Sequence, residues 1–248
     1  MQINPIKTRS IIPGDGSTLE AILAEYVTDL KENSVVLVTS KIVSICEGRF
    51  IKVGTVDKDE LIITESERYL PRIKNKFNVA VTIAHGIFGA NAGIDESNAN
   101  DYYVLWPEDP QASANRIRVY LRQKFGLKNL GVVITDSKTT PLRWGVTGIS
   151  LAHSGFLALK DYIGTPDIFG RQFQFEKLNV ADSLATAGVL AMGEGNEQTP
   201  LAIVSDIPTI TFQENDPTLE ELKSLEISID EDVFGDFLKN AQWEKGKK

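Results

Sequence analysis

The chain has 248 residues, of which 42% are hydrophobic and 24% are charged. This composition is typical of a globular protein and too apolar for a disordered one, and the length fits one elaborate domain or two interlocked ones. With 34 acidic and 26 basic residues the formal net charge is −8, which disfavours a nucleic-acid backbone as the principal ligand.

The cysteine and histidine content limits the metal chemistry. Cys46 is the only cysteine, and His85 and His153 are the only histidines. A disulfide within the chain, a cysteine cage for zinc and an H-E-x-x-H site are therefore excluded. A bound metal would need mainly oxygen ligands, which suit magnesium or manganese, ions that usually accompany phosphate chemistry.

Apolar segments are short throughout the sequence. No run approaches the roughly 18 apolar residues of a membrane span, and Met1 to Ser17 lacks the apolar stretch of a signal peptide. We therefore expect a cytoplasmic protein without a membrane partner.

The first predicted elements are a helix and a buried strand. Ser17 and Glu20 form a capping box, and apolar residues recur at helical spacing as far as Leu30. The run Val35 to Val38 predicts a buried strand. It leads directly into Ser40-Lys41 at the start of a short apolar stretch, and this order predicts a candidate anion site.

A glycine-rich region follows in the middle of the chain. Residues 78–90 predict two short strands around a turn at Gly86. The next segment carries Gly93 and then Asp95. A carboxylate placed directly after a glycine turn is directed toward a ligand or caps the turn itself.

A helix and a strand are expected next. Asp109-Pro110 is a helix start, one face of the following segment is apolar, and Gly126 is the stop signal. Residues 131–134 predict a strand that terminates in Thr135-Asp136-Ser137.

Strands and helices alternate irregularly in the last hundred residues. We expect extended segments at 146–157 and 173–180, a helix at 181–192, a Gly-Glu-Gly loop at 193–195, a strand at 201–204 and an acidic helical tail from Asp216 onward. No internal repeat or low-complexity segment interrupts this pattern. The predicted class is α+β, with mixed sheets and flanking helices.

Several common catalytic motifs are absent from the sequence. There is no P-loop, neither Gly14-Asp15-Gly16 nor Gly193-Glu194-Gly195 extends to G-x-G-x-x-G, and no G-x-S-x-G elbow exists. Cys46 stands in apolar company, which favours a buried packing thiol over a nucleophile.

Three carboxylates remain as candidates for chemistry. Asp95 follows a glycine turn, Asp136 ends an apolar strand and Glu194 lies between two glycines. Converging oxygen ligands of this kind would bind magnesium or manganese, whereas taken singly each residue also fits a turn former or helix cap. Sequence spacing alone does not decide whether they converge.

Six motifs in order along the chain carry a family resemblance. They are V-V-L-V-T-S-K-I-V-S-I-C-E-G-R (35–49), H-G-I-F-G-A-N-A-G-I-D-E-S-N (85–98), W-P-E-D-P-Q-A-S-A (106–114), V-V-I-T-D-S (132–137), R-W-G-V-T-G (143–148) and M-G-E-G (192–195). From about residue 10 to 205 the chain resembles the coenzyme F420-0:L-glutamate ligase family, the gamma-glutamyl ligases that extend a deazaflavin cofactor.

The resemblance implies a nucleotide-dependent amide ligase. It would use GTP or ATP with magnesium or manganese to add L-glutamate to a carboxylate acceptor through an acyl phosphate, with only small molecules as substrates. The implied architecture is a two-lobed α+β subunit in an intertwined homodimer. A ligase domain would span residues 1–210, and residues 211–248 would form the acidic tail.

The resemblance also implies roles for individual residues. The metal-binding positions, through which the carboxylates would act in catalysis, are Asp95, Asp136, Ser137 and Glu194. The nucleotide-binding positions are Ser10, Ile11, Ser40, Lys41, Asn98, Met192, Gly193, Gly195 and Asn196.

Two departures from the family pattern concern charged contacts. Ile45 stands where the family usually has a lysine, and Lys138-Thr139-Thr140 replaces a usual Gly-Arg pair, with Arg143 retained. Lys41 or Lys138 would be the substitute for the missing charge. The departures predict a changed acceptor, such as a glutamate oligomer or a folate, or else a nucleotide- and metal-binding homologue that has lost ligation.

Three other residues keep two interpretations each, and a fourth keeps one. Arg49 and Arg143 fit either a bidentate clamp on a substrate carboxylate or ordinary surface ion pairs. His85 fits a substrate contact or a turn histidine bonded to backbone. His153 lies among small and apolar residues and is interpreted as structural.

Overall fold

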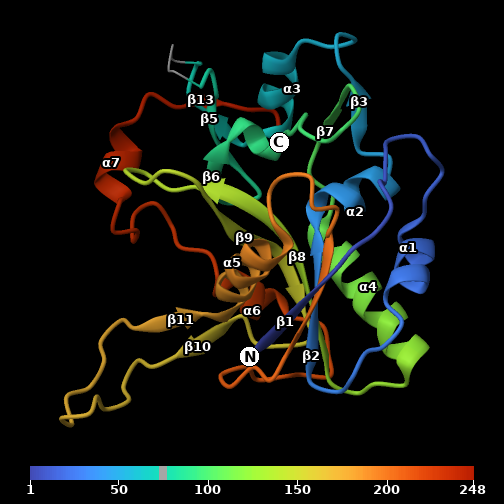
Figure 1. Cartoon of the computed structure of the whole chain (residues 1–248). Coiled ribbons are helices and arrows are strands. Elements are labelled where there is room, and N and C mark those ends of the chain that lie inside the picture. Colours follow the sequence, from blue (N-terminus) through green and yellow to red (C-terminus); the bar gives the residue numbers. More distant parts are fainter. Residues whose placement is uncertain (73–76) are drawn as a thin grey trace.

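A five-stranded mixed sheet forms the centre of the computed structural model (Figure 1), which describes residues 1–72 and 77–248. In spatial order its strands are β1 (Gln2–Ile6), β12 (Leu201–Ser205), β2 (Ser34–Thr39), β8 (Leu130–Thr139) and β9 (Val146–Ser154). Strands β2 and β8 run parallel, and the other neighbours are antiparallel. The expected mixed α+β class is confirmed.

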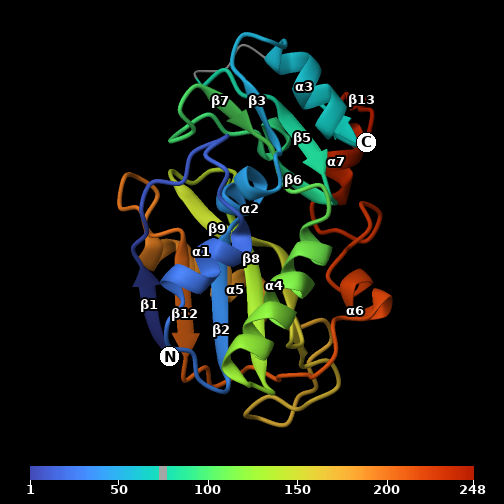
Figure 2. The ribbon, with the colours of Figure 1, turned by 90° about the vertical axis from the view of Figure 1, so that its right-hand side faces the viewer.

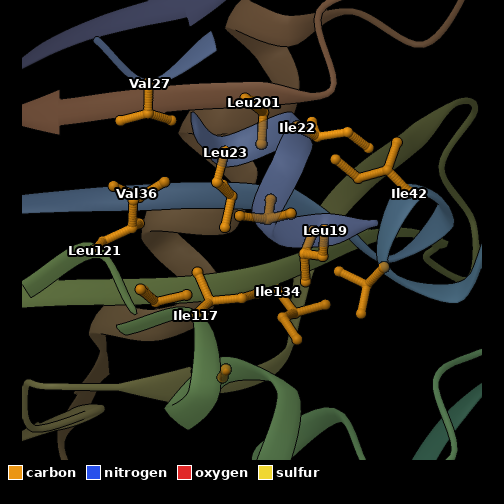
Figure 3. Packing of buried hydrophobic residues seen from close by; sticks show 14 of the residues in the cluster. Leu19, Ile22, Leu23, Val27, Val36, Ile42, Ile117, Leu121, Ile134 and Leu201 are labelled. Carbon is orange, nitrogen blue, oxygen red and sulfur yellow. The ribbon is translucent and has the colours of Figure 1, made fainter. Parts of the chain in front are cut away.

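Helices cover both faces of this sheet. The longer helices are α1 (Leu19–Tyr26), α4 (Pro110–Phe125) and α5 (Val180–Met192). Side chains of α1 and α4 pack with Val36 and Val38 on one face (Figure 3), whereas α5 packs with Val35 and Leu37 on the other. Because successive strand side chains point to opposite faces, the continuous run Val35 to Val38 supplies both cores.

Local end signals determine the bounds of α4. The Asp109 side chain accepts a hydrogen bond from the amide of Ala112, Pro110 occupies the first turn, and Gly126 ends the helix at φ 67°. These expected bounds are confirmed. For α1 the expected cap at Ser17 is wrong by one residue, since Thr18 accepts from the amide of Ala21.

Strand β8 is longer than its apolar run. It was expected to terminate at Thr135 to Ser137, but it continues to Thr139 in antiparallel pairing with β9. The register shifts between Ile134 and Thr135, which is the signature of a β-bulge and re-aims the following side chains. Asp136 therefore lies within a paired strand and not at its end.

A second group of elements lies beyond one end of the central sheet (Figure 2). It includes the short helix α2 (Ser40–Cys46), helix α3 (Lys58–Glu65), the 3₁₀ turn η1 (Asn91–Gly93), the pair β3 (Phe50–Lys52) and β7 (Tyr102–Val104), and a sheet of β13 (Glu244–Lys245), β4 (Arg68–Tyr69), β5 (Val81–Ala84) and β6 (Ile87–Ala90). The predicted strands around Gly86 are confirmed as β5 and β6.

A hairpin arm projects from the central sheet in Figure 1. Its paired strands are β10 (Leu159–Asp161) and β11 (Lys177–Asn179). The expected extended segment 173–180 thus pairs over only three residues before α5 begins. Its outer part exposes large apolar side chains, among them Ile168 at 91% and Phe169 at 89%.

The C-terminal tail crosses from the central sheet to the second group of elements (Figures 1 and 2). Only part of it is helical, in α6 (Leu219–Lys223) and α7 (Gly235–Asn240), and α6 begins after Thr218 instead of Asp216. The tail ends in β13, which pairs with β4. The prediction of a helical tail is therefore only partly right.

Among residues 1–72 and 77–248, no helix has the length and apolar content needed to cross a membrane.

Candidate active site

A pocket of about 450 Å³ lies where the central sheet meets the second group of elements. Its lining residues come from within segments 8–12, 39–45, 93–106, 135–137 and 189–200. Thr39 of β2 and Thr135 of β8 are register partners, so these two parallel strands deliver their following residues to the same place. Ligands of α/β sheets commonly bind at such strand ends.

Asp95 and Lys41 form an ion pair within this pocket. The Lys41 Nζ lies 2.6 Å from Asp95 Oδ2, and Ser97 donates from its amide to Oδ1 at 2.8 Å. Burial opposes ionisation of Asp95, but the Lys41 charge and the Ser97 hydrogen bonds outweigh it and lower the pKa of the carboxyl. Asp95 is therefore an anion at neutral pH, with its charge held next to a lysine.

Asp136 is the most strongly perturbed carboxyl of the pocket. Burial, aided by the nearby Asp95, raises its pKa to about 6 against the opposing effect of two hydrogen bonds. The indole N–H of Trp106 donates to Oδ2, and the amide of Ser137 donates to Oδ1 at 2.8 Å. Each oxygen thus has one protein donor and keeps lone pairs for a ligand.

Glu194 brings a third carboxylate from the loop after α5. Burial raises its pKa, while a hydrogen bond with Ser137 and the charge of Lys41 act in the opposite direction. The same charges, Lys41 and Asp95, thus influence both Asp136 and Glu194. The segments that carry Asp95, Asp136 and Glu194 are distant in sequence, but the charge of Lys41 acts on all three carboxyls.

The loop around Glu194 carries a further carboxylate, that of Glu197, and backbone amides with partners of their own. The amide of Gly195 donates to Glu197 Oε2 at 2.8 Å. Gly193 adopts φ 82°, and a Cβ there would lie 2.4 Å from Glu197 Cδ, so a side chain at this position would strain the backbone and displace the Glu197 carboxylate. The side chain of Asn98 donates to the carbonyl of Gly195 at 2.8 Å and ties the loop to the Asp95 segment. The amide of Gly195 thus already binds an anionic group, whereas the amide of Gly193 donates to the carbonyl of Val189 at 2.9 Å.

All the residues expected at the metal and nucleotide positions line the same pocket. The set comprises Asp95, Asp136, Ser137 and Glu194 together with Ser10, Ile11, Ser40, Lys41, Asn98, Met192, Gly193, Gly195 and Asn196. Ser10 and Met192 are further linked to the loop before β12, since Gln198 donates to Ser10 Oγ at 3.0 Å and Thr199 donates to the carbonyl of Met192.

The chemistry of these donors fits an oxygen-preferring divalent cation. Within the described residues, no three histidine, cysteine or acidic side chains are gathered closely enough to enclose a metal as they stand. The nearest cation to Asp95 is the Lys41 ammonium. Three carboxylates and a hydroxyl around one pocket are the ligand types that magnesium and manganese take; enclosing the ion requires side-chain movement.

The departures from the family pattern lie at different distances from the pocket. Ile45 is 6% exposed and lines the pocket, so an apolar side chain occupies the position usual for a lysine. Lys138 and Arg143 are not among the described residues that line it. Arg143 lies on the exposed turn between β8 and β9, where its amide donates to Thr140.

Arg49 is engaged by protein groups. Its guanidinium lies 2.7 Å from Glu65 and 3.1 Å from Glu108, and its Nε donates to the carbonyl of Trp106 at 3.1 Å. Among the described residues that line the pocket, Arg49 is not found. A substrate contact by Arg49 or Arg143 stays a prediction.

The two histidines and the cysteine have distinct environments. His85 adopts φ 49° in the turn between β5 and β6, beside Trp106, and burial together with Lys248 lowers its pKa. His153 is 1% exposed, and burial lowers its pKa to about 4. Burial raises the pKa of the Cys46 thiol to about 12. Both His153 and Cys46 are thus neutral packing groups.

Trp106 and Glu197 are pocket residues to which sequence reasoning assigned no role. Trp106 stands inside one of the family motifs, directly before Pro107, at a position 7% exposed. An indole that follows a strand and precedes a proline was a usable signal, because such an N–H needs a partner when buried. Glu197 gave no signal beyond its place after two glycines.

The chain is similar to known proteins over most of its length. The profile of the family described as F420-0:Gamma-glutamyl ligase matches residues 5–206. The Coenzyme F420:L-glutamate ligase of Methanopyrus kandleri is 34% identical over 82% of this chain and 86% of its own length. Proteins of the same name from Methanococcus maripaludis and Halorubrum lacusprofundi are 31% and 32% identical, covering 94% and 92% of this chain and 97% and 93% of their own lengths.

Proposed function

Because the chain belongs to the F420-0:gamma-glutamyl ligase family and is thus a ligase, we propose that it adds L-glutamate through an amide bond to a carboxylate acceptor, using GTP or ATP and a divalent cation. The observation that carries this proposal is the convergence of Asp95, Asp136 and Glu194 around Lys41 in one pocket. Carboxylates for a cation and a lysine for phosphate oxygens are the parts that phosphoryl transfer needs.

The chain's own residues would bind and orient the nucleotide phosphates. Lys41 lies at the pocket wall and serves as a point charge for phosphate oxygens. The amide of Gly195 serves as a further donor once Glu197 moves away. The side chains that would hold magnesium or manganese are Asp95, Asp136, Ser137 and Glu194. When bound, such an ion neutralises the charge on the phosphate oxygens.

The proposed reaction balances in two steps. An oxygen of the acceptor carboxylate attacks the terminal phosphorus of the nucleotide, and the nucleoside diphosphate leaves. The amine of glutamate then attacks the acyl carbon, phosphate leaves with the bridging oxygen, and the amine loses a proton. Such chemistry needs positioning and charge neutralisation more than a protein nucleophile, in agreement with the neutral thiol of Cys46.

The departures favour an acceptor other than, or broader than, the deazaflavin cofactor. Ile45 replaces a lysine at the pocket wall, whereas Thr139-Thr140, which replaces part of a Gly-Arg pair, is not among the described residues that line the pocket. Loss of a charge-assisted contact of about 1.5 to 3 kcal/mol weakens binding roughly 10- to 150-fold. An acceptor with an extra phosphate would suffer more than a glutamate oligomer or a folate.

The direct test is product analysis. The protein is incubated with GTP or ATP, manganese and glutamate, with and without the deazaflavin cofactor, a glutamate oligomer or a folate as acceptor. The products are identified by mass spectrometry, and the released phosphate is quantified. We expect one phosphate released for each amide formed. Phosphate release without any amide product would overturn the ligase proposal. Ligation confined to the deazaflavin acceptor would overturn only the proposed change of acceptor.

We further propose a two-lobed subunit that forms a homodimer through the hairpin arm. The arm exposes Ile168, Phe169 and Phe175 at 85% or more, and apolar surface of this kind usually meets a partner. Sedimentation should give a dimer for the wild type and a monomer for an Ile168→Asp, Phe169→Asp variant. Val233→Asp, at an exposed apolar residue of the tail, is the matched control. A wild-type monomer contradicts the proposal.

A further inference from the structure

The carboxylate of Asp136 depends on Trp106 for one of its two protein hydrogen bonds. The indole N–H donates to Oδ2, whereas the amide of Ser137 donates to Oδ1. The Ser137 amide belongs to the adjoining residue of β8, so it moves with Asp136. The indole comes from a separate segment beyond β7, and it alone of these two donors fixes the carboxylate relative to another part of the pocket.

The indole ring also contacts the segment that carries Asp95. A Cβ on Gly93 would lie 2.0 Å from Trp106 Cε2, and Gly93 adopts φ +72°. Only glycine therefore lets the ring rest at this point, two residues before Asp95. Trp106 thus packs against one carboxylate-bearing segment and hydrogen bonds to the other.

Arg49 holds the backbone of Trp106 from outside the pocket. Its Nε donates to the carbonyl of Trp106 at 3.1 Å. Its two terminal nitrogens form ion pairs with Glu65 at 2.7 Å and Glu108 at 3.1 Å. The guanidinium fork is therefore fixed on three sides, a geometry that a lysine cannot reproduce.

The C-terminal tail completes this support. Lys248 Nζ lies 3.0 Å from Glu65 Oε2 and 3.8 Å from Glu108 Oε1. Two cations and two carboxylates thus form one cluster behind the tryptophan. The tail reaches this place by pairing β13 with β4 (Figure 2).

We propose that Trp106 is a positioning residue for the Asp136 carboxylate, and that Arg49 positions Trp106 in turn. This inference rests on the proposed metal- and nucleotide-dependent function. Groups that orient a metal-binding carboxylate typically change metal affinity 10- to 100-fold when they are removed. Trp106 acts through Asp136 and needs no contact with the reacting atoms.

The test compares Mn²⁺ binding by full-length variants, measured by electron paramagnetic resonance without nucleotide and with GTP. Trp106→Phe keeps a ring against Gly93 and removes the donor, and we expect its Mn²⁺ dissociation constant to rise about 10- to 100-fold. The KM for glutamate should stay unchanged. Trp144→Phe and Trp243→Phe, at the other two tryptophans, are matched controls with wild-type affinity.

A double variant separates positioning from general packing. In an Asp136→Asn background, adding Trp106→Phe should weaken residual Mn²⁺ binding no further, because the affected carboxylate is already gone. If both changes weaken binding independently, Trp106 does not act through Asp136 and the proposal is overturned.

Arg49→Lys tests the outer support and leaves the indole in place. It keeps the positive charge but loses the Nε donor, so we expect weakened Mn²⁺ binding, to a smaller degree than in Trp106→Phe. If Trp106→Phe fails to fold, the Mn²⁺ affinity of Arg49→Lys tests the proposal instead. Wild-type Mn²⁺ affinity in Arg49→Lys would then overturn it.

Two results distinguish the inference from the proposed function. Wild-type protein that binds no Mn²⁺, alone or with nucleotide, overturns both. Wild-type protein that binds Mn²⁺ with the same affinity as folded Trp106→Phe overturns the positioning role alone and leaves the ligase proposal standing.

Discussion

Asp136 and Asp95 have opposite pKa shifts although they share one pocket. Burial raises the pKa of Asp136 to about 6, whereas Lys41 and Ser97 lower the pKa of Asp95. The difference follows from the cation, which lies 2.6 Å from Asp95 and only influences Asp136 from further away. The protein's own groups compensate the negative charge of Asp136 poorly. A second cation bound near Asp136 would therefore be stabilised by this carboxylate.

Asp136→Asn and Asp95→Asn should each lower kcat at least about 100-fold while leaving the fold intact, because the described residues that line the pocket include no histidine or cysteine to replace the lost oxygen ligand. Steady-state amide formation and circular dichroism measure the two effects. Asp230→Asn, at an exposed carboxylate of the tail paired with Lys239, is the control. Full activity in either pocket variant would refute the metal assignment.

Lys41→Ala should weaken nucleotide binding about 10- to 100-fold, since it removes the point charge proposed for the phosphates. Calorimetric titration with GTP and magnesium provides the affinity. Lys128→Ala, at a lysine paired with Glu214 outside the pocket, should leave the affinity unchanged. Unaltered binding by Lys41→Ala would place the phosphates elsewhere.

His153 predicts a pH dependence of stability. Burial lowers its folded-state pKa to about 4 from 6.5, so between these values the unfolded chain binds a proton that the folded chain does not. The free energy of unfolding is therefore unaffected by His153 above pH 6.5. It falls as the pH is lowered, by about 2 kcal/mol at pH 5. Urea unfolding at pH 7.5 and 5 should show a smaller acid loss for His153→Leu. Equal losses in both proteins would contradict this.

At the scale of elements, a buried arginine of α4 binds the start of the tail. Arg118 is 1% exposed, pairs with Asp216 at 3.0 Å and donates to the carbonyls of Leu130, Gln213 and Glu214. The desolvation cost of burying the guanidinium is offset by these partners. The attachment explains how a largely irregular, acidic segment follows a fixed path.

Arg118→Met should lower the free energy of unfolding by about 3 kcal/mol, because it removes the Arg118 donor from the carbonyls of Leu130 and Gln213 and the ionic partner of Asp216. It should also expose the chain after residue 206 to limited proteolysis. Arg116→Met, at an exposed neighbour paired with Glu47, should cost less than about 1 kcal/mol. Equal losses in the two variants would contradict the attachment.

Local signals account for the elements that sequence reasoning located well. Asp109-Pro110 and Gly126 determine the ends of α4 without help from the rest of the chain. The continuation of β8 beyond Thr135 could not be predicted in this way, because it depends on pairing with β9 across a bulge. The strand β13 was missed for the same reason, since its partner β4 lies about 175 residues away in sequence.

At the scale of the whole molecule, the site consists of residues whose convergence no local pattern contains. The sequence identified Asp95, Asp136 and Glu194 individually, and family resemblance grouped them. Their common pocket depends on the parallel pairing of β2 with β8 and on the loop that returns from α5. Trp106 was missed as a partner of Asp136 because 30 residues separate them in sequence.

The proposed acyl phosphate predicts which product receives one oxygen atom of the acceptor carboxylate. If the pocket activates a carboxylate with the terminal phosphoryl group, the oxygen that bridges carbon and phosphorus must leave with the released phosphate. The acceptor carboxylate is therefore labelled with ¹⁸O and incubated with the protein, nucleotide, manganese and glutamate, and the released phosphate is analysed by mass spectrometry. We predict one labelled oxygen in each phosphate formed together with an amide product. Amide formation that releases only unlabelled phosphate would contradict the proposed activation.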